Sequence, residues 1–303
     1  MTTLRALVAA VALAFLAGPA AAQQQDFSKV EIKVTKLAEG IYMLEGQGGN
    51  MGLSVGKDAT FLIDDQFAPL SDKIADAIAT VTNRPVNFVM NTHWHGDHTG
   101  GNENFGRTGA IIIAQDNVRK RLAEVTELRG QPREVSPPQA LPVITFGEDV
   151  TVHINGYTIH GMHMVPTHTD GDTIVYFEEA NVLHTGDAFI NAGYPFVDQE
   201  SGGDFDGFIA TTKRILALIN DDTTIIPGHG PVSGKKDVEE TLKVLTLMRE
   251  RVAALIKKKM SRDEVIKANP MPEYRDTWGA GFMGPDAIIG AAYDSITKSM
   301  KKK

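Results

Sequence analysis

The first part of the chain is dominated by short apolar runs that predict β-strands. Residues 30–37 alternate between apolar and polar side chains, which is the period of a strand with one buried face. Further short apolar runs follow at residues 41–44, 51–55, 59–63 and 86–90. The Gly-rich stretch 46–50 predicts a hairpin loop between the first two of these runs. Before the last run, residues 69–81 carry apolar side chains at helical spacing and predict a helix.

The alternation of strands and helices continues through the rest of the chain. A crossing loop with four prolines is predicted at residues 129–142, and the Gly- and aromatic-rich stretch 191–207 predicts an active-site loop. Further strands are predicted at residues 110–114, 150–154, 157–165, 173–177, 182–184 and 224–226. Further helices are predicted at residues 117–128, 208–219, 235–260, 262–268 and 285–300. This order predicts a single α/β domain built from two similar halves packed in layers.

The first 22 residues have the pattern of a secretory signal peptide. One basic side chain precedes the apolar run at residues 6–16, and three alanines at residues 20–22 supply the small residues of a cleavage site. The apolar run is short for a membrane span, and no other run in the sequence is long and apolar enough to cross a bilayer. We therefore expect a mature chain of residues 23–303 that is periplasmic or secreted, without stable insertion into a membrane.

Composition and charge narrow the classes of function. Of the 303 residues, 42% are hydrophobic and 22% are charged, which is usual for a globular protein. The formal net charge of −8 argues against a nucleic-acid-binding protein, which needs a basic surface. The absence of cysteine excludes disulfides, thiolate metal ligands and a cysteine nucleophile. A small-molecule substrate is the expected partner, and the sequence leaves the oligomeric state open.

One stretch, residues 91–102, concentrates side chains that bind metals. It contains His93, His95, Asp97 and His98 within six residues, and imidazole and carboxylate groups are common zinc ligands. If the backbone is extended, the first two histidines point the same way. The other two ligands follow on a Gly-containing turn that can aim them at a second point. A surface cluster of histidines is the alternative, but four potential ligands in one turn favour a site for two adjacent metals.

Three further candidate ligands each follow a predicted strand. His168, Asp187 and His229 all lie in turns that contain Gly or Pro. Turns at the ends of rigid strands hold side chains to the small tolerances that a metal requires. One histidine beside a turn is ordinary, but four such stretches in one chain without cysteine indicate a metal site. His163 and His184 lie close to these ligands in sequence and are candidates for orienting them through a ring N–H.

The ordered set of motifs, from His93-x-His95-x-Asp97-His98 to His229, resembles that of the metallo-β-lactamase superfamily. The resemblance implies a four-layer αββα sandwich over residues 23–303. It also implies a hydrolase with two Zn²⁺ ions, although nitrogen and oxygen ligands are also compatible with Fe or Mn. It assigns His93, His95 and His168 to the first metal, Asp97, His98 and His229 to the second, and Asp187 to both. Asp97 is also the expected catalytic residue.

The resemblance implies an exported dinuclear zinc hydrolase whose metal-bridging hydroxide attacks the carbonyl of a cyclic or activated acyl substrate. Asp187 stands where many β-lactamases of the superfamily have Cys or Ser, and the segment 188–195 has no lysine to hold a β-lactam carboxylate. We therefore expect a β-lactamase-like enzyme whose hydrolysis of β-lactams, where it occurs, is weak. One alternative is a thioesterase or lactonase of the glyoxalase II type, which export disfavours because glutathione thioesters are cytosolic. The other is a non-catalytic periplasmic protein that binds a metal or a ligand.

The wall that faces the substrate is expected to come from loops rich in Gly and aromatic residues. These are residues 47–51, Phe67, residues 191–196 and residues 278–283. Trp94, which lies between two candidate ligands, is expected to pack in the core or in the wall of the site.

Overall fold

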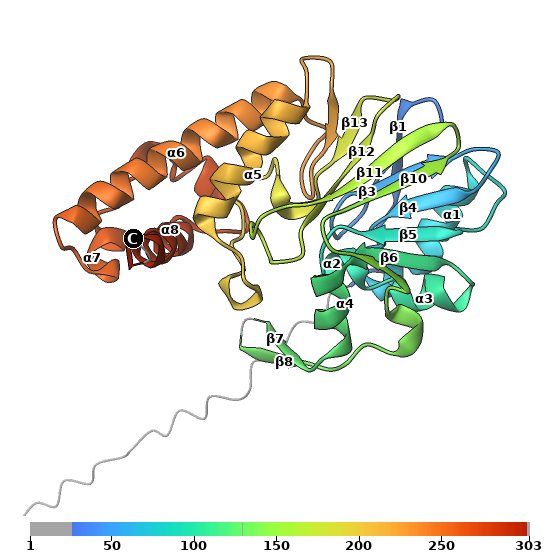
Figure 1. The fold of residues 1–303 in the computed structure, drawn as a ribbon, viewed down its shortest axis with the longest axis horizontal. Helices are drawn as coiled ribbons and strands as arrows, with labels where there is room; N and C mark the ends of the chain where they lie inside the picture. Colours follow the sequence, from blue (N-terminus) through green and yellow to red (C-terminus); the bar gives the residue numbers. More distant parts are fainter. Residues whose placement is uncertain (1–25, 129, 302–303) are drawn as a thin grey trace, which may run out of the picture.

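Two β-sheets packed face to face form the centre of the molecule. The computed structural model describes residues 26–128 and 130–301, and the predicted signal peptide, residues 1–22, lies outside these described residues. Helices cover the outer face of each sheet, so the layers follow the order αββα (Figure 1). The predicted α/β class and its four-layer arrangement are confirmed.

The first sheet has seven strands in the order β1-β2-β3-β4-β5-β6-β9. Neighbouring strands from β1 to β4 are antiparallel, whereas β4, β5, β6 and β9 run parallel. The strands are β1 (Lys33–Ala38), β2 (Ile41–Glu45), β3 (Met51–Val55), β4 (Thr60–Ile63), β5 (Phe88–Asn91), β6 (Ile111–Gln115) and β9 (Ile144–Phe146). In the parallel part, the ends of neighbouring strands lie at the same edge, which is where open α/β sheets place their ligand sites.

The second sheet has five strands in the order β10-β11-β12-β13-β14. Its first four strands are antiparallel neighbours, and β14 joins β13 in parallel. The strands are β10 (Asp149–Ile154), β11 (Tyr157–His163), β12 (Thr173–Phe177), β13 (Val182–His184) and β14 (Thr224–Ile226). The sheet therefore starts from a plain meander and ends in a crossover that carries helix α5 (Phe205–Leu218) over its outer face.

Alternating side chains divide the strands between the layers of the core. In β4, Phe61 and Ile63 face the second sheet, whereas Leu62 faces the helices outside the first sheet. In β13, Val182 faces the first sheet and Leu183 faces α5. These two strands are apolar on both faces because both faces are covered, and burial of these faces holds the layers together.

The helices form the two outer layers and a C-terminal extension. The first sheet is accompanied by α1 (Ser71–Ala79), α2 (Gly96–Thr99), α3 (Asn102–Arg107) and α4 (Asp116–Ala123). The second sheet carries α5 and α6 (Lys235–Lys257), and the chain closes with α7 (Arg262–Lys267) and α8 (Pro285–Lys301). Residues of α5, α6, α7 and α8 share one apolar cluster, so the helices of the last third of the chain pack together as one unit.

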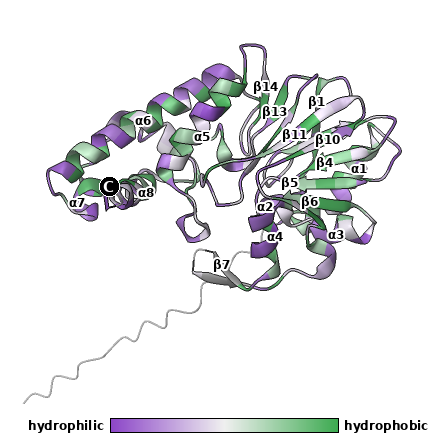
Figure 2. Ribbon diagram, viewed as in Figure 1, coloured by the Kyte–Doolittle hydropathy of each residue, from purple (hydrophilic) through white to green (hydrophobic). Residues whose placement is uncertain are grey.

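The long helix α6 is amphipathic rather than apolar all round. Figure 2 shows hydrophilic and hydrophobic residues alternating along its length. Its apolar side, which includes Val244, Met248 and Val252, packs in the cluster with α5 and α8. Within residues 26–128 and 130–301, no helix combines the length and the apolar character that spanning a bilayer requires.

The helix expected at residues 117–128 is too long, and the crossing loop after it contains a strand. Helix α4 ends at Ala123, and Glu124 is already extended with φ −119° and ψ 156°. The β-branched Val125 and Thr126 then favour a strand. The resulting β7 (Thr126–Leu128) pairs antiparallel with β8 (Gln131–Arg133) across a turn in which Gly130 has a φ of +69°.

We expect the contact between the two sheets to dominate stability. Ile159 of β11 is fully buried between them, whereas Ile144 of β9 is 43% exposed. Replacing Ile159 by Ala should therefore lower the free energy of unfolding by about 2–5 kcal/mol. The matched change Ile144→Ala should cost less than about 1 kcal/mol. Urea unfolding followed by circular dichroism measures both values, and equal losses would contradict the assignment of Ile159 to the core.

Candidate metal centre

All seven candidate ligands follow the ends of strands, in turns or in short helices, and the fold brings these segments together. His93, His95, Asp97 and His98 follow β5, and the last two lie in the short helix α2 instead of the open turn expected from the sequence. The remaining three follow β11, β13 and β14: His168, Asp187 and His229. Their ligand atoms form three overlapping groups in which the atoms lie within 4.8 Å of one another.

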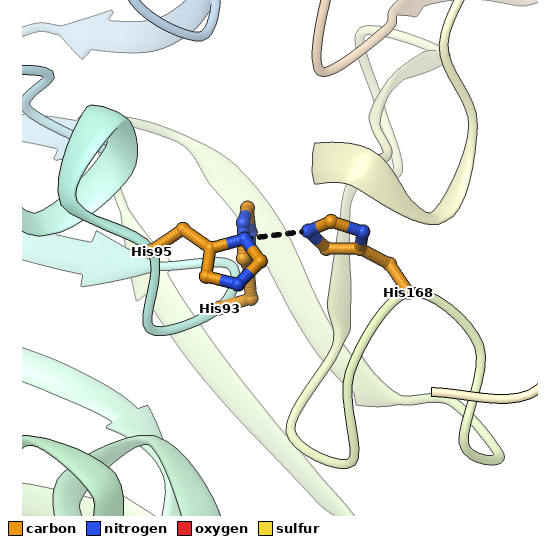
Figure 3. A group of neighbouring side chains, drawn as sticks. All are labelled: His93, His95 and His168. Atoms are coloured by element: carbon orange, nitrogen blue, oxygen red, sulfur yellow. Dashed lines mark hydrogen bonds between the residues drawn. The ribbon is translucent and has the colours of Figure 1, made fainter. Parts of the chain in front are cut away.

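The first group contains His93, His95 and His168, whose rings converge on one point (Figure 3). His95 Nδ1 and His168 Nε2 are 2.8 Å apart. The outer nitrogens of these two rings donate to Asp198 Oδ2 (2.9 Å) and to the carbonyl oxygen of Phe196 (2.7 Å). Burial lowers the pKa of His168 to about 4, so its ring is neutral at pH 7. The two nitrogens that face each other are within hydrogen-bond distance, and both belong to the set of atoms that could bind one cation.

The second group contains Asp97, His98 and His229. Asp97 Oδ2 is 3.4 Å from His229 Nε2 and 3.7 Å from His98 Nε2. His98 Nδ1 donates to Asp64 Oδ2 at 2.7 Å, which turns its Nε2 toward the group. A side chain at Gly49 would overlap the His98 ring, since its Cβ would lie 2.1 Å from a ring atom. The hairpin loop between β2 and β3 therefore closes directly on this ligand.

Asp187 lies between the two groups. Its Oδ2 is 3.5 Å from His168 Nε2 in the first group. Its Oδ1 is 3.2 Å from His98 Nε2 and 3.4 Å from His229 Nε2 in the second. A Cβ at Gly228 would lie 2.1 Å from Oδ1, so the absence of a side chain there makes room for the carboxylate. One carboxylate thus faces both groups, one oxygen to each.

Several buried ligand atoms have no hydrogen-bond partner among the described residues. They are His93 Nε2, His98 Nε2 and Asp187 Oδ1. A buried polar atom without a partner costs free energy, so such atoms are rare unless something else binds them. Three of them at the centre of one histidine and carboxylate cluster fit a site for divalent metal ions.

The electrostatics of the cluster also favour cations. Burial alone would lower the pKa of His98 and of His229, but neighbouring carboxylates outweigh it. Asp187, Asp97 and Asp64 raise the pKa of His98 well above its usual value, and Asp187 with Asp97 raises that of His229 to about 10. Without a metal, the cluster therefore gathers protons, and metal binding would release them.

Two carboxylates that position ligands were missed in the sequence analysis, Asp64 and Asp198. Asp64 follows β4 with a φ of 60° and accepts hydrogen bonds from Thr92 N (2.8 Å) and Thr92 Oγ1 (2.7 Å) as well as from His98. The signal for it was present, because a pair of aspartates ends a buried run there. Asp198 lies in the irregular loop before α5, where nothing in the sequence distinguishes it from a solvated side chain.

The two histidines expected to orient ligands do so at most indirectly. His184 Nε2 donates to the carbonyl oxygen of Asn50 (3.0 Å), and its Nδ1 accepts from Gly186 N (3.1 Å), next to Asp187. His163 Nε2 donates to the carbonyl oxygen of Asp170 (3.1 Å). None of these hydrogen bonds joins the ring of His163 or His184 to a candidate ligand. Trp94 is fully buried, as expected for a residue of the core.

The cluster opens to solvent on the side of its second group. The side chains of His229 and Asp97 are 33% and 29% exposed, whereas His93 and His168 are 1% exposed. Two of the four expected wall segments lie against the cluster, and a third reaches it through the ring of Phe196. These contacts join Gly49 to His98, Asn191 N to the carbonyl oxygen of His229 (2.8 Å), and Phe282 through Phe196 to His95. The ring of Phe67 packs instead against Phe27.

Comparisons with known proteins place these residues in one family. The family model described as the metallo-beta-lactamase superfamily matches residues 45–229, which include all seven candidate ligands. A hydroxyacylglutathione hydrolase of Polaromonas sp. is 35% identical over 53% of this chain and 55% of its own length, so this chain spans about half of that relative. A metallo-beta-lactamase type 2 of Bacteroides fragilis is 22% identical over 75% of this chain and 91% of its own. The solved metallo-beta-lactamase from Pontibacter korlensis shares the fold, with a TM-score of 0.61, 20% identity, and coverage of 71% of this chain and 99% of that one.

The contact between Asp198 and His95 gives a test of the ligand geometry. The two carboxylate oxygens of Asp198 accept hydrogen bonds from His95 Nε2 and from Ser201 N. The side chain of Asn has only one oxygen, so in Asp198→Asn one of these donors would face an NH₂ group. We expect the affinity for zinc to fall about 10- to 100-fold, as is typical when a residue that orients a ligand is changed. Competition with a chromophoric chelator measures it. The exposed Asp222→Asn is the matched control, and equal affinities in the two variants would contradict the role of Asp198.

Proposed function

This chain belongs to the metallo-beta-lactamase superfamily of metal-dependent hydrolases, and we propose that it is an exported enzyme that uses two zinc ions to hydrolyse a cyclic or activated acyl compound. The observation that carries the proposal is the position of Asp187, whose two oxygens face two separate groups of histidines. A carboxylate in that position can serve two metals at once. The predicted signal peptide supports export to the periplasm or beyond.

In this proposal, each group of residues holds one metal. His93, His95 and His168 would hold the first, and Asp97, His98 and His229 would hold the second. Asp187 would serve both. Nitrogen and oxygen ligands without thiolates suit zinc and leave room for a further ligand, and iron or manganese would be bound by the same donor set. Metal analysis of the purified chain distinguishes these ions.

The reaction that fits this site is the attack of water on an acyl carbonyl. When bound, zinc ions supply Lewis acidity, which acidifies water to a pKa of about 7 and stabilises the negative charge that develops on the substrate. Asp97 lies on the open side and remains ionised, because His98 and His229 outweigh the effect of burial and hold its pKa well below its usual range. Its carboxylate would accept a hydrogen bond from the attacking water and orient it toward the substrate.

The substrate class follows from what the wall lacks. The segment 188–195 lies against His229 through the hydrogen bond of Asn191 N and contains no charged side chain. No lysine is available in it to hold the carboxylate of a β-lactam. This favours neutral acyl compounds such as esters and lactones, with weak hydrolysis of β-lactams as a side activity.

A thioesterase of the glyoxalase II type is the second candidate. The 35% identity to a hydroxyacylglutathione hydrolase supports it, although the match covers 55% of that protein. The proposed export opposes it, because glutathione thioesters are cytosolic. A metal-binding protein without catalytic activity is the third candidate, and the following experiment distinguishes all three.

We expect the purified mature chain to contain about two zinc ions per molecule and to hydrolyse an aryl ester or a homoserine lactone faster than nitrocefin or S-D-lactoylglutathione. A strong chelator should abolish turnover, and added zinc should restore it. Inductively coupled plasma mass spectrometry and spectrophotometric assays provide the two readouts. Full turnover after chelation would contradict the metal mechanism. Fastest turnover of the thioester would favour the thioesterase. Bound metal without any turnover would favour the non-catalytic binding protein.

Asp187→Ala tests the shared ligand. Because the carboxylate serves both groups, its loss should lower the metal content and the rate together, with kcat reduced by about 10²-fold or more. The control is Asp222→Ala, an exposed aspartate on the loop before β14, which should retain both metals and the full rate. Two fully occupied metal sites in Asp187→Ala would show that this residue does not bridge them.

A further inference from the structure

An aromatic segment near the C-terminus is fixed against the loop that follows Asp187. The segment runs over residues 278–283 and begins with the short 3-10 helix η6 (Trp278–Ala280). The carbonyl oxygen of Trp278 accepts a hydrogen bond from Tyr194 N (3.0 Å), and the two rings are 5.8 Å apart. Tyr194 is fully buried, so this contact joins the segment to the core beside the site.

Two glycines allow the backbones of the segment and the loop to touch. A Cβ at Gly281 would lie 2.2 Å from the carbonyl oxygen of Ala192, and one at Gly193 would lie 2.5 Å from that of Trp278. Gly193 also has a φ of +103°, a conformation that other residues rarely adopt. The approach is therefore close enough to fix where the side chains of residues 282 and 283 lie.

These two side chains take opposite roles. Met283 is 8% exposed and packs in the apolar cluster of α5, α6, α7 and α8. Phe282 is 71% exposed, which makes it the most exposed aromatic ring among the large hydrophobic residues of the described chain. Anchoring of its neighbour in the core gives Phe282 a defined position at the surface.

The position of Phe282 links it to the candidate metal centre. Its ring is 5.8 Å from that of Phe196, in an edge-to-face arrangement. The Phe196 ring in turn lies 6.0 Å from His95 and 5.5 Å from His168, and its carbonyl oxygen holds the ring of His168. The two phenylalanine rings thus form a chain of ring contacts that starts at the first ligand group and ends at the exposed ring of Phe282.

A single exposed hydrophobic residue is ordinary on a protein surface. Phe282 differs in two respects. Its ring packs against Phe196, which itself packs against two candidate ligands, and a backbone contact fixes the segment that carries it. Ligand sites combine polar groups that act on the reacting atoms with apolar walls that hold the rest of the ligand. An alkyl chain or aryl ring attached to a carbonyl at the metal centre would cover this surface and be removed from water.

We propose that Phe196 and Phe282 form a subsite for an apolar acyl chain or aryl group, so that the preferred substrates are esters or lactones with a medium-length alkyl or an aryl substituent. This rests on the proposed function for the reacting carbonyl. Phe282 comes from residues beyond the stretch 45–229 that the family model matches, so the subsite depends on the C-terminal part of this chain. Phe282 acts in binding and takes no part in bond cleavage.

The test compares p-nitrophenyl acetate with p-nitrophenyl octanoate on the zinc-loaded enzyme. For the unmodified chain, kcat/KM should be about tenfold or more higher for octanoate, mainly through a lower KM. In Phe282→Ala, this preference should fall about tenfold, and Phe282→Leu should restore most of it. Val143→Ala is the matched control, because Val143 is also 70% exposed. An unchanged preference in Phe282→Ala, or no preference in the unmodified chain, would overturn the proposal.

A pair of glycine variants tests the placement of the segment. Gly281→Ala should displace it from the loop and lower the preference for octanoate, since the added Cβ would meet the carbonyl oxygen of Ala192. Gly284→Ala is the control, because no atom lies within 4 Å of the Cβ that it adds. Equal preferences in the two glycine variants would contradict the role of the close backbone contact.

Binding separates this proposal from the proposed hydrolysis. Calorimetry with sodium octanoate and sodium acetate measures the subsite even if no ester is turned over. We expect octanoate to bind the unmodified chain at least about tenfold more tightly than acetate, and Phe282→Ala to lose this difference. Absence of metal-dependent turnover with retained octanoate binding would reject the hydrolase and keep the subsite, whereas equal binding of the two anions would reject the subsite.

Discussion

The arrangement around Asp187 is stable only if a positive charge lies within it. Its carboxylate and the facing imidazoles are buried, and burial of ionised or unpartnered polar groups is costly unless they are paired. Protons on His98 and His229 provide that charge in part, as their raised pKa values indicate. Divalent ions would provide it more fully, since they would also bind the lone pair of His93 Nε2, which has no hydrogen-bond partner among the described residues. The surrounding fold must therefore hold the buried carboxylates and imidazoles close together although this is electrostatically costly.

Rigid strand ends and hydrogen bonds to the outer ring nitrogens supply that restraint. Asp64 holds His98, Asp198 holds His95, and the carbonyl of Phe196 holds His168, at distances between 2.7 and 2.9 Å. Each contact fixes which nitrogen points inward, so the ligand geometry is set before any metal binds. Asp64 accepts hydrogen bonds from three donors, two on Thr92 and one on His98, with a backbone φ of 60°, which is uncommon for a residue other than glycine. Such strain is tolerated where surrounding contacts determine the conformation, as they do at this strand end.

The sequence predicted the four layers and the set of candidate ligands. It did not predict most of the hydrogen bonds that hold these ligands in place. Apolar runs located most strands, because burial on both faces leaves a local signal in residues such as Phe61 and Leu62. The seven candidate ligands could be identified from the sequence because each follows an apolar run. The structure brings these residues together. Their binding of metal remains a prediction. Asp198 could not be selected, since it lies 103 residues from His95 in the sequence and nothing local marks it. The β7–β8 hairpin was missed for a related reason, because apolar spacing in α4 continued past the point where Glu124 becomes extended.

The division of the chain at His229 suggests how chemistry and recognition are separated in this molecule. Residues 45–229 contain every candidate ligand and match the family, whereas α6, α7, α8 and the segment 278–283 lie beyond that match. A metal centre tolerates little change, because seven side chains must converge within a few ångströms. An apolar wall tolerates much more, since it needs only a surface of suitable shape beside the reacting carbonyl. Because Gly193 and Gly281 join the two parts by backbone contact, the C-terminal helices can place Phe282 at the site without contributing any ligand to it. In the proposed subsite, changes in residues 278–283 would alter the substrate preference and leave the candidate ligands in place.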